Sequence, residues 1–159
     1  MNYYCRYDSP VGILRLESDG NHLTGLYFTT DIHFPQTDIP VFCNVTTWLN
    51  AYFSGTPCEP DFPIHMSGTA FQKQVWEILR FIPFGEVRTY GDIAREMAAR
   101  TGKRKMSAQA VGQAVNRNPV SIIIPCHRVV GAGGKLTGYA GGIEKKEWLL
   151  NHEYHTCFF

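Results

Sequence analysis

Cys126 and His127 are neighbours in the sequence Ile122-Ile123-Ile124-Pro125-Cys126-His127-Arg128. The thiolate is the reactive form of cysteine, and an imidazole can favour it by accepting the thiol proton. The apolar β-branched run before Pro125 predicts a buried strand, which the proline ends because it has no N–H to donate. The pair therefore indicates a sulfur nucleophile with an adjacent base. The alternative is an accidental pairing of a buried cysteine with an exposed histidine.

Other chemistry finds little support in the sequence. The five cysteines are an odd number and are scattered, so they do not indicate a disulfide framework: Cys5, Cys43, Cys58, Cys126 and Cys157. No C-x-x-C or H-x-x-x-H spacing indicates a metal site. The glycine-rich segment 131–142 lacks the GK[ST] ending of a phosphate loop and follows no Rossmann strand. We expect it to form one wall of a pocket.

The composition, with 44% hydrophobic and 18% charged residues, is typical of a globular protein. No apolar run approaches the roughly 20 residues of a membrane span, and no secretory signal is visible. We therefore expect no membrane association and a cytoplasmic location, or a nuclear one in a eukaryote. Thiols remain reduced in these compartments.

Charge is distributed unevenly along the chain. Residues 1–66 carry two basic and seven acidic side chains, a net charge of −5, whereas residues 67–159 carry thirteen and seven, a net charge of +6. We predict two domains with these bounds, joined by a Pro-rich linker over residues 57–63. The basic second half favours a polyanionic partner, although small domains also differ in charge by chance.

The first half predicts a small α+β domain. Strands are expected over residues 2–7, 11–18 and 22–29, with turn residues between them, so antiparallel hairpins follow. Apolar residues at helical spacing predict a helix from about 39 to 54 that packs on the sheet. We find no candidate chemistry in this half.

The second half predicts a series of helices. The capping box formed by Thr69 and Gln72 starts one, Thr89 starts a second and Ser107 caps a third over residues 108–116. A last helix begins near Ile143. The second and third helices have the outline of a helix-turn-helix unit.

The third predicted helix is rich in small residues, which permit close approach to another backbone, either protein or DNA. Gln109 lies in its first turn, where recognition helices place contacts. Four basic residues flank the helix and could neutralise phosphates, namely Lys103, Arg104, Lys105 and Arg117. Tight packing between helices is the alternative explanation.

Six stretches over about residues 67–155 resemble, in order, the O6-alkylguanine-DNA alkyltransferases, also called methylated-DNA–protein-cysteine methyltransferases. They are Phe84-Gly85-Glu86-Val87-x-x-Tyr90-Gly91, Ala110-Val111-Gly112, Asn118-Pro119, Ile124-Pro125-Cys126-His127-Arg128-Val129-Val130, Gly138-Tyr139-x-Gly141-Gly142 and Lys146-Glu147-x-Leu149-Leu150. The first half matches this family only in outline, and the zinc ligands of some members are not recognisable.

The resemblance implies an α+β fold. A small antiparallel-sheet-plus-helix domain of ribonuclease-H-like type is followed by a mainly helical, winged-helix-like domain with a helix-turn-helix. It implies irreversible, single-turnover transfer of an alkyl group, such as methyl, to the protein's own cysteine. The donor is O6 of guanine, with O4 of thymine as a second candidate, on a base flipped out of double-stranded DNA. No cofactor, metal ion or obligate protein partner is implied, and we expect a monomer.

The resemblance also implies roles for individual residues. Cys126 would accept the alkyl group, His127 would take its proton through a water, Glu153 would orient His127, and Tyr90 would donate to the guanine ring. The substrate pocket would be lined by Asn118, Val129, Tyr139 and Ala140. The DNA-binding residues would be Lys103, Arg104, Lys105, Gln109, Ala110, Gly112, Arg117 and Arg128.

Two positions depart from the family pattern. Gln109 stands where an arginine commonly fills the space left by the flipped base, so DNA affinity is expected to be lower. Ala140 stands where some members have serine. Two other functions compete with the alkyltransferase. One is a non-catalytic module that binds alkylated DNA, which the presence of Cys126 argues against. The other is a cysteine hydrolase, whose catalytic pair generally comes from distant segments.

Overall fold

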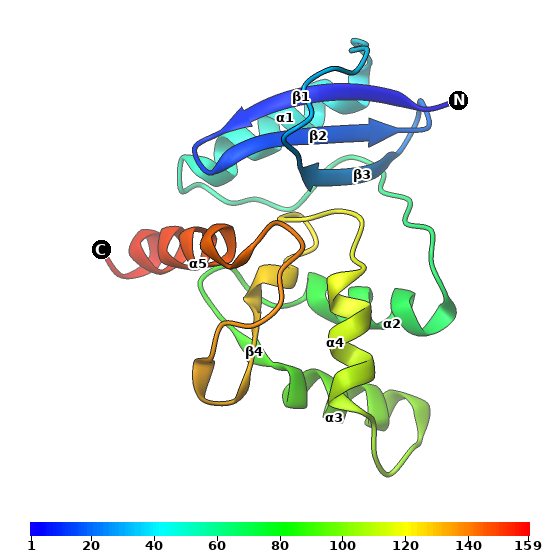
Figure 1. Cartoon of the computed structure of the whole chain (residues 1–159), viewed down its shortest axis with the longest axis vertical. Helices are drawn as coiled ribbons and strands as arrows, with labels where there is room; N and C mark the ends of the chain where they lie inside the picture. Colours follow the sequence, from blue (N-terminus) through cyan, green and yellow to red (C-terminus); the bar gives the residue numbers. More distant parts are fainter. The chain divides into compact units, whose positions relative to one another are not determined.

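The computed structural model describes all residues from 1 to 159. The chain forms two compact units, one of residues 1–67 with 119–121 and the other of residues 68–118 with 122–159. Figure 1 traces the chain through both units. No helix is long and apolar enough to cross a membrane. The fold class is α+β, a sheet domain followed by a helical one, as the sequence predicts.

The first unit is built on an antiparallel sheet of β1 (Tyr3–Ser9), β2 (Gly12–Ser18) and β3 (Leu23–Phe28), in that order. Helix α1 (Pro40–Phe53) packs against all three strands (Figure 1). Alternation along β2 directs Leu14 and Leu16 into the core, and Leu23 and Leu26 of β3 are also fully buried. The three strands and the helix predicted for this half are thus present.

Two other segments pair with β3. Leu23 accepts a hydrogen bond from the N–H of His65 at 2.9 Å, and its own N–H donates to the Pro63 carbonyl at 2.8 Å. The Pro-rich segment therefore ends as a short addition to the sheet. Val120 bridges to Leu26 in the same parallel sense, which is why residues 119–121 belong to the first unit.

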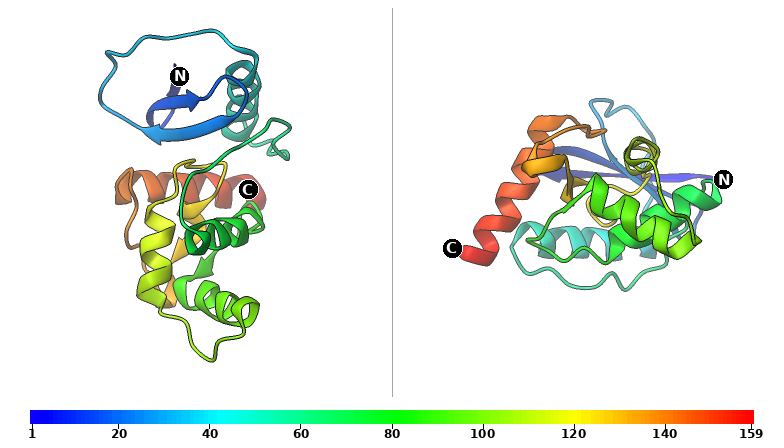
Figure 2. Two further views of the ribbon diagram at one scale, coloured as in Figure 1. Left: turned by 90° about the vertical axis from the view of Figure 1, so that its right-hand side faces the viewer. Right: turned by 90° about the horizontal axis from the view of Figure 1, so that it is seen from below.

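The second unit is mainly helical. It contains α2 (Ala70–Arg80), α3 (Tyr90–Thr101), α4 (Ala108–Asn116) and α5 (Ile143–Phe158). Helices α2, α3 and α4 pack against one another (Figure 2). Side-chain caps start three helices as predicted, because Thr69, Thr89 and Ser107 each accept a backbone N–H of the first turn. Their buried faces share a core of aliphatic residues, Val75, Leu79, Ile93, Met97, Val111 and Val115.

A short parallel pair joins the helical segments around residue 126. It consists of β4 (Arg88–Thr89) and β5 (Val129–Val130), with Arg88 opposite Val129. The 3-10 turn η1 (Cys126–Arg128) comes immediately before β5. A second 3-10 turn, η2 (Ala132–Gly134), lies in the glycine-rich segment that leads to α5. Since β4 runs directly into α3, the pair places η1 next to the start of that helix.

The strand predicted for Ile122–Ile124 is wrong. These residues form a buried turn, and Ile122 adopts a left-handed backbone with φ of 70°. The Asn118 side chain donates to the Ile124 carbonyl at 2.7 Å, which closes the turn on itself. Burial of the three isoleucines satisfies their apolar character without any strand pairing. Such a backbone costs a β-branched residue on the order of 1–3 kcal/mol, which the surrounding core must offset.

Candidate functional site

Cys126 is the first residue of η1 and is only 6% exposed. Its N–H donates to the Ile124 carbonyl at 2.8 Å, and the N–H of Arg128 donates to the Pro125 carbonyl at 3.0 Å. In a strand, Cys126 and His127 would point to opposite faces, whereas a 3-10 turn separates successive side chains by only about 120°. The turn that starts after Pro125 therefore allows both side chains to face the interior.

The thiol of Cys126 is favoured over the thiolate in this setting. Burial raises the pKa of Cys126, while a hydrogen bond with Asn118 and the positive charge of Lys146 partly oppose that rise. A buried thiol with a raised pKa needs a base to become a nucleophile. The sulfur is thus protected at rest and depends on its neighbours for activation.

His127 is fully buried next to the carboxylate of Glu153. Its Nε2 lies 2.5 Å from Glu153 Oε2, and its Nδ1 is buried with no protein partner. Burial lowers the pKa of His127, against the opposing effect of Glu153. A neutral ring with its proton on Nε2 fits this environment, because that proton is the one donated to Glu153. Nδ1 then carries the lone pair that can accept a proton.

Glu153 is held by donors from two segments, η1 and the loop at Gly85. Arg128 Nε donates to Oε1 at 2.8 Å and its second amino group to Oε2 at 3.2 Å, while the Gly85 N–H donates to Oε1 at 3.1 Å. Burial disfavours the anion, but the hydrogen bond from His127 and the charge and hydrogen bonds of Arg128 hold the pKa of Glu153 well below its usual range. The carboxylate therefore remains ionised.

The position of Arg128 corrects our expectation that it contacts DNA. Its side chain is buried, and its third nitrogen donates to the Ile82 carbonyl at 2.7 Å. The guanidinium also lies 5.6 Å from the centre of the Phe84 ring. Glu153 is the only carboxylate paired with Arg128, and the pair turns the arginine inward. Nothing in the sequence around Arg128 indicated that this side chain would be buried in an ion pair with Glu153.

Tyr90 begins α3 and is half-buried. Its hydroxyl donates to the Thr137 carbonyl at 3.1 Å, and burial raises its pKa. The same carbonyl accepts a second bond from Lys146 Nζ at 2.8 Å. Tyr90 is therefore linked to the loop that precedes α5 on the side of the unit that holds Cys126.

Lys146 is a residue that the sequence argument missed. It is fully buried, pairs with no carboxylate and lies 5.8 Å from the centre of the Tyr90 ring. Burial lowers its pKa to about 8, against the opposing effect of Cys126. A signal existed in the sequence, because Lys146, Leu149 and Glu153 are spaced by three and four residues and so share one face of α5.

The predicted pocket residues occupy different settings. Asn118 is buried and connects the end of α4 to the turn before Cys126 through its bond to Ile124. Val129 is fully buried in β5. Tyr139 and Ala140 lie in the loop before α5, partly exposed and exposed respectively. The structure thus brings Asn118 and Val129 to the cysteine, whereas Ala140 lies at the surface and Tyr139 is partly exposed with its hydroxyl buried.

The exposed side chains of helix α4 include both small and amide groups, Ala108, Gln109, Gln113 and Asn116. Val111, Ala114 and Val115 face the core, while Gln109 is exposed and Ala110 and Gly112 are partly exposed. A Cβ on Gly112 would lie 3.7 Å from the Tyr90 ring, an ordinary contact, so glycine is not needed there to avoid a clash. Gly112 therefore lies close to Tyr90, while the exposed face of α4 carries amide side chains as well as alanine.

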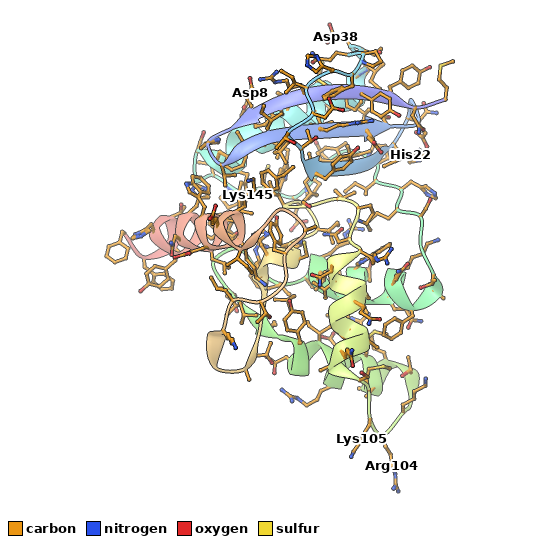
Figure 3. The ribbon with its side chains drawn as sticks, viewed as in Figure 1. Asp8, His22, Asp38, Arg104, Lys105 and Lys145 are labelled. Atoms are coloured by element: carbon orange, nitrogen blue, oxygen red, sulfur yellow. The ribbon has the colours of Figure 1, made fainter.

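Four exposed basic side chains flank α4 and form no ion pair, Lys103, Arg104, Lys105 and Arg117. Figure 3 places Arg104 and Lys105 at the tip of the loop between α3 and α4, directed away from the helices. Beside Arg117, α2 and α4 border a groove of about 720 Å³. Unpaired cations around a polar, uncharged helix face can bind a polyanion.

Comparisons with known proteins agree along the whole chain. The family described as "6-O-methylguanine DNA methyltransferase, DNA binding domain" matches residues 70–155, and "6-O-methylguanine DNA methyltransferase, ribonuclease-like domain" matches residues 2–66. A methylated-DNA–protein-cysteine methyltransferase of Mycobacterium tuberculosis is 44% identical over 96% of this chain and 93% of its own length. One from Methanosarcina acetivorans is 44% identical over 95% and 97%.

Solved structures of methyltransferases are also similar to this chain along nearly its whole length. A crystal structure of Mycobacterium tuberculosis OGT in complex with DNA has a TM-score of 0.84 and 44% identity, covering 97% of this chain and 94% of that chain. A crystal structure described as the O6-methylguanine methyltransferase of that organism has a TM-score of 0.83 and 43% identity, covering 98% and 94%. The likeness extends through both units.

Proposed function

Because this chain belongs to the 6-O-methylguanine DNA methyltransferase family, we propose that it repairs DNA by direct reversal of alkylation. The proposed reaction moves an alkyl group, such as methyl, from O6 of guanine in double-stranded DNA to the sulfur of Cys126. The observation that carries this proposal is the buried array of Cys126, His127 and Glu153, in which His127 Nδ1 has no protein partner.

The proposed chemistry begins with removal of the thiol proton. A water passes this proton to Nδ1 of neutral His127, and the ionised Glu153 stabilises the imidazolium that results. The Cys126 thiolate then attacks the alkyl carbon from the side opposite O6. A carbon–sulfur bond forms as the carbon–oxygen bond breaks, and the bonding electrons pass to the guanine.

Tyr90 is proposed to stabilise the departing guanine. Negative charge grows on the base as the bond to O6 breaks, and a hydroxyl donor directed at the ring would offset it. The Tyr90 hydroxyl is half-buried and already makes a hydrogen bond to Thr137. In the complex with DNA, it would exchange this carbonyl for the base.

The proposed reaction ends with the protein consumed. A thioether has no easy leaving group, so water does not regenerate the cysteine, and each chain acts once. No cofactor or metal ion takes part in any of these steps. The resemblance assigns the same roles to Cys126, His127, Glu153 and Tyr90, and the hydrogen bonds of His127 and Glu153 support the roles of those two residues.

DNA binding is proposed to occur through α4. This helix, which is rich in small residues, would enter the minor groove, and Lys103, Arg104, Lys105 and Arg117 would contact phosphates. The target nucleotide would be flipped out toward a pocket bordered by Asn118, Val129, Tyr139 and Ala140. Gln109, exposed in the first turn of α4, would fill the space left in the duplex. O4 of thymine is a second candidate substrate.

We further propose that the protein acts as a monomer in the cytoplasm, without an obligate protein partner. Bacterial and archaeal relatives support this location, as do five free cysteines, which persist in a reducing compartment. In those organisms, the chromosomal DNA is in the same compartment.

The experiment is mass analysis after incubation with duplex DNA that contains one O6-methylguanine. We expect the peptide containing Cys126 to gain one methyl group in place of a hydrogen. A Cys126→Ser variant should bind DNA without transfer, and Cys157→Ser, at an exposed cysteine, should transfer as the wild type does. DNA binding without any methyl on the protein would instead favour a non-catalytic lesion-binding module. A methyl group on another cysteine would reject the proposed acceptor.

A further inference from the structure

Arg128 and His127 share one carboxylate in the interior of the second unit. Glu153 accepts two hydrogen bonds from the guanidinium and one from the imidazole, and all three residues are at most 8% exposed. An arginine side chain keeps its proton at all physiological pH values. The positive charge of Arg128 therefore compensates the negative charge of the Glu153 carboxylate, whatever the protonation state of His127.

A count of buried charge distinguishes two states of this group. With neutral His127, the positive charge of Arg128 and the negative charge of Glu153 cancel. With protonated His127, the group carries one uncompensated positive charge in a buried site, which is costly. Without Arg128, the preference reverses, because a protonated His127 would then neutralise Glu153. The histidine would rest in the form that cannot accept a proton.

The structure fixes Arg128 in this role by contacts on every side of the guanidinium. Two of its nitrogens bind the two oxygens of Glu153, and the third donates to the Ile82 carbonyl at 2.7 Å. The Phe84 ring lies beside it, at 5.6 Å between the ring centre and the guanidinium carbon. This bidentate arrangement fixes Glu153 as well as supplying the charge.

We propose that Arg128 is a positioning residue for the base, whose fixed charge on Glu153 keeps His127 uncharged in the resting protein. The proposal rests on the proposed function, since it explains how His127 stays competent to take the proton of Cys126. The charge is supplied by the residue that directly follows His127 in the sequence. In this proposal, Arg128 controls proton transfer and does not contact DNA.

Each of the other charged and titratable groups near His127 either favours or disfavours protonation of its ring, or carries no charge. On η1, Cys126 is a thiol at rest. On α5, Lys146 disfavours an imidazolium, as does Arg128, and Glu153 favours it. Gly85, from the segment before β4, contributes only a backbone N–H to Glu153. Tyr90 of α3 bears no charge near neutral pH, because burial raises its pKa. Without Arg128, Lys146 is therefore the only charge that opposes the effect of Glu153 on the pKa of His127.

The test is the pH dependence of single-turnover methyl transfer in an Arg128→Met variant. Loss of a neighbouring charge commonly shifts a pKa by about one to three units, so we expect the acid limb of the profile to move up by at least about one pH unit. At a pH well below both limbs, a shift of one unit corresponds to roughly a tenfold loss of rate relative to the wild type. Arg128→Lys, which keeps the positive charge, should retain an acid limb near that of the wild type.

Arg80→Met is the matched control, because Arg80 is an exposed arginine in the last turn of α2 with no ion pair. It should leave the profile unchanged. A purely structural role for Arg128 predicts equal loss of rate at every pH, and that result would overturn the proposal. A wild type that transfers no methyl group would reject the proposed function instead, so the two failures are distinguishable.

Nitrogen-15 NMR of the His127 ring provides a readout that needs neither variant folding nor activity. In the DNA-free wild-type protein, we expect a neutral ring at pH 6 with the proton on Nε2. A doubly protonated ring at pH 7 would contradict the proposal directly. If Arg128→Met folds, its His127 should become protonated at a pH at least about one unit higher than in the wild type.

Discussion

Glu153→Gln changes the charge at the centre of the site with almost no change in volume. Four N–H donors point at the carboxylate, two from Arg128 and one each from His127 and Gly85. A glutamine has an NH2 group in place of one of the two carboxylate oxygens. Since each of those oxygens accepts from two donors, the NH2 group would face two donors. If that group faces His127, the ring must carry its proton on Nδ1 in order to accept at Nε2. The base would then be in the wrong tautomer.

The magnitude follows from these contacts. A triad with the wrong histidine tautomer in a serine protease loses about 10⁴ in rate, so we expect single-turnover transfer to fall by roughly 10² to 10⁴. The buried charge of Arg128 also loses its partner, which costs about 3–5 kcal/mol of folding free energy when a buried pair is broken. Its remaining bond to Ile82 favours the lower end of that range. DNA affinity should not change, because α4 and its basic flanks are untouched.

The assay combines single-turnover transfer, DNA binding and denaturant unfolding on the same preparations. Glu147→Gln is the control, because Glu147 is exposed on α5 and forms no ion pair, and it should match the wild type in all three. Transfer by Glu153→Gln within about threefold of the wild type would refute the assignment of the base. Equal losses of transfer and DNA binding would indicate general damage to the unit.

Further predictions concern DNA affinity, a backbone position and acid stability. Replacing Lys103, Arg104 and Lys105 with alanine should weaken DNA binding and reduce its dependence on salt by up to about three counterions, as measured by titration at several salt concentrations. Gly85→Ala should destabilise the fold by about 1–3 kcal/mol, because φ is 85° and the new Cβ would lie 2.5 Å from Cys157 Sγ, and Cys157→Ala should restore part of this loss in unfolding experiments. Because the pKa of His127 is lower in the folded state than in the unfolded chain, stability should fall as pH drops below about 6.5, by at most about 1.4 kcal/mol per unit. His127→Gln should flatten this part of the curve measured by denaturant unfolding.

Local signals in the sequence account for most of the helix starts. At the first of them, the Gln72 N–H donates to the Thr69 hydroxyl at 3.1 Å, and the Thr69 N–H donates back to the Gln72 side chain at 3.0 Å. Such caps depend only on residues within one turn, so the pattern predicts them well. Alternation of leucines in β2 similarly predicts its buried face.

Features that depend on distant partners were not predictable in the same way. The run Ile122–Ile124 has the composition of a strand, yet its backbone is set by Asn118 and the surrounding core. Arginine and lysine usually lie at the surface, but Arg128 and Lys146 are both buried. Whether a charged side chain faces inward depends on its charge partners and hydrogen-bond acceptors, and these come from other segments.

The most direct measurement of the central claim is the number of methyl groups transferred per chain when O6-methylguanine duplex is in large excess. We predict that transfer stops at one methyl per protein molecule and that this methyl is found on Cys126. Continued loss of methyl from the DNA beyond one equivalent, or a single equivalent located elsewhere in the chain, would contradict the account.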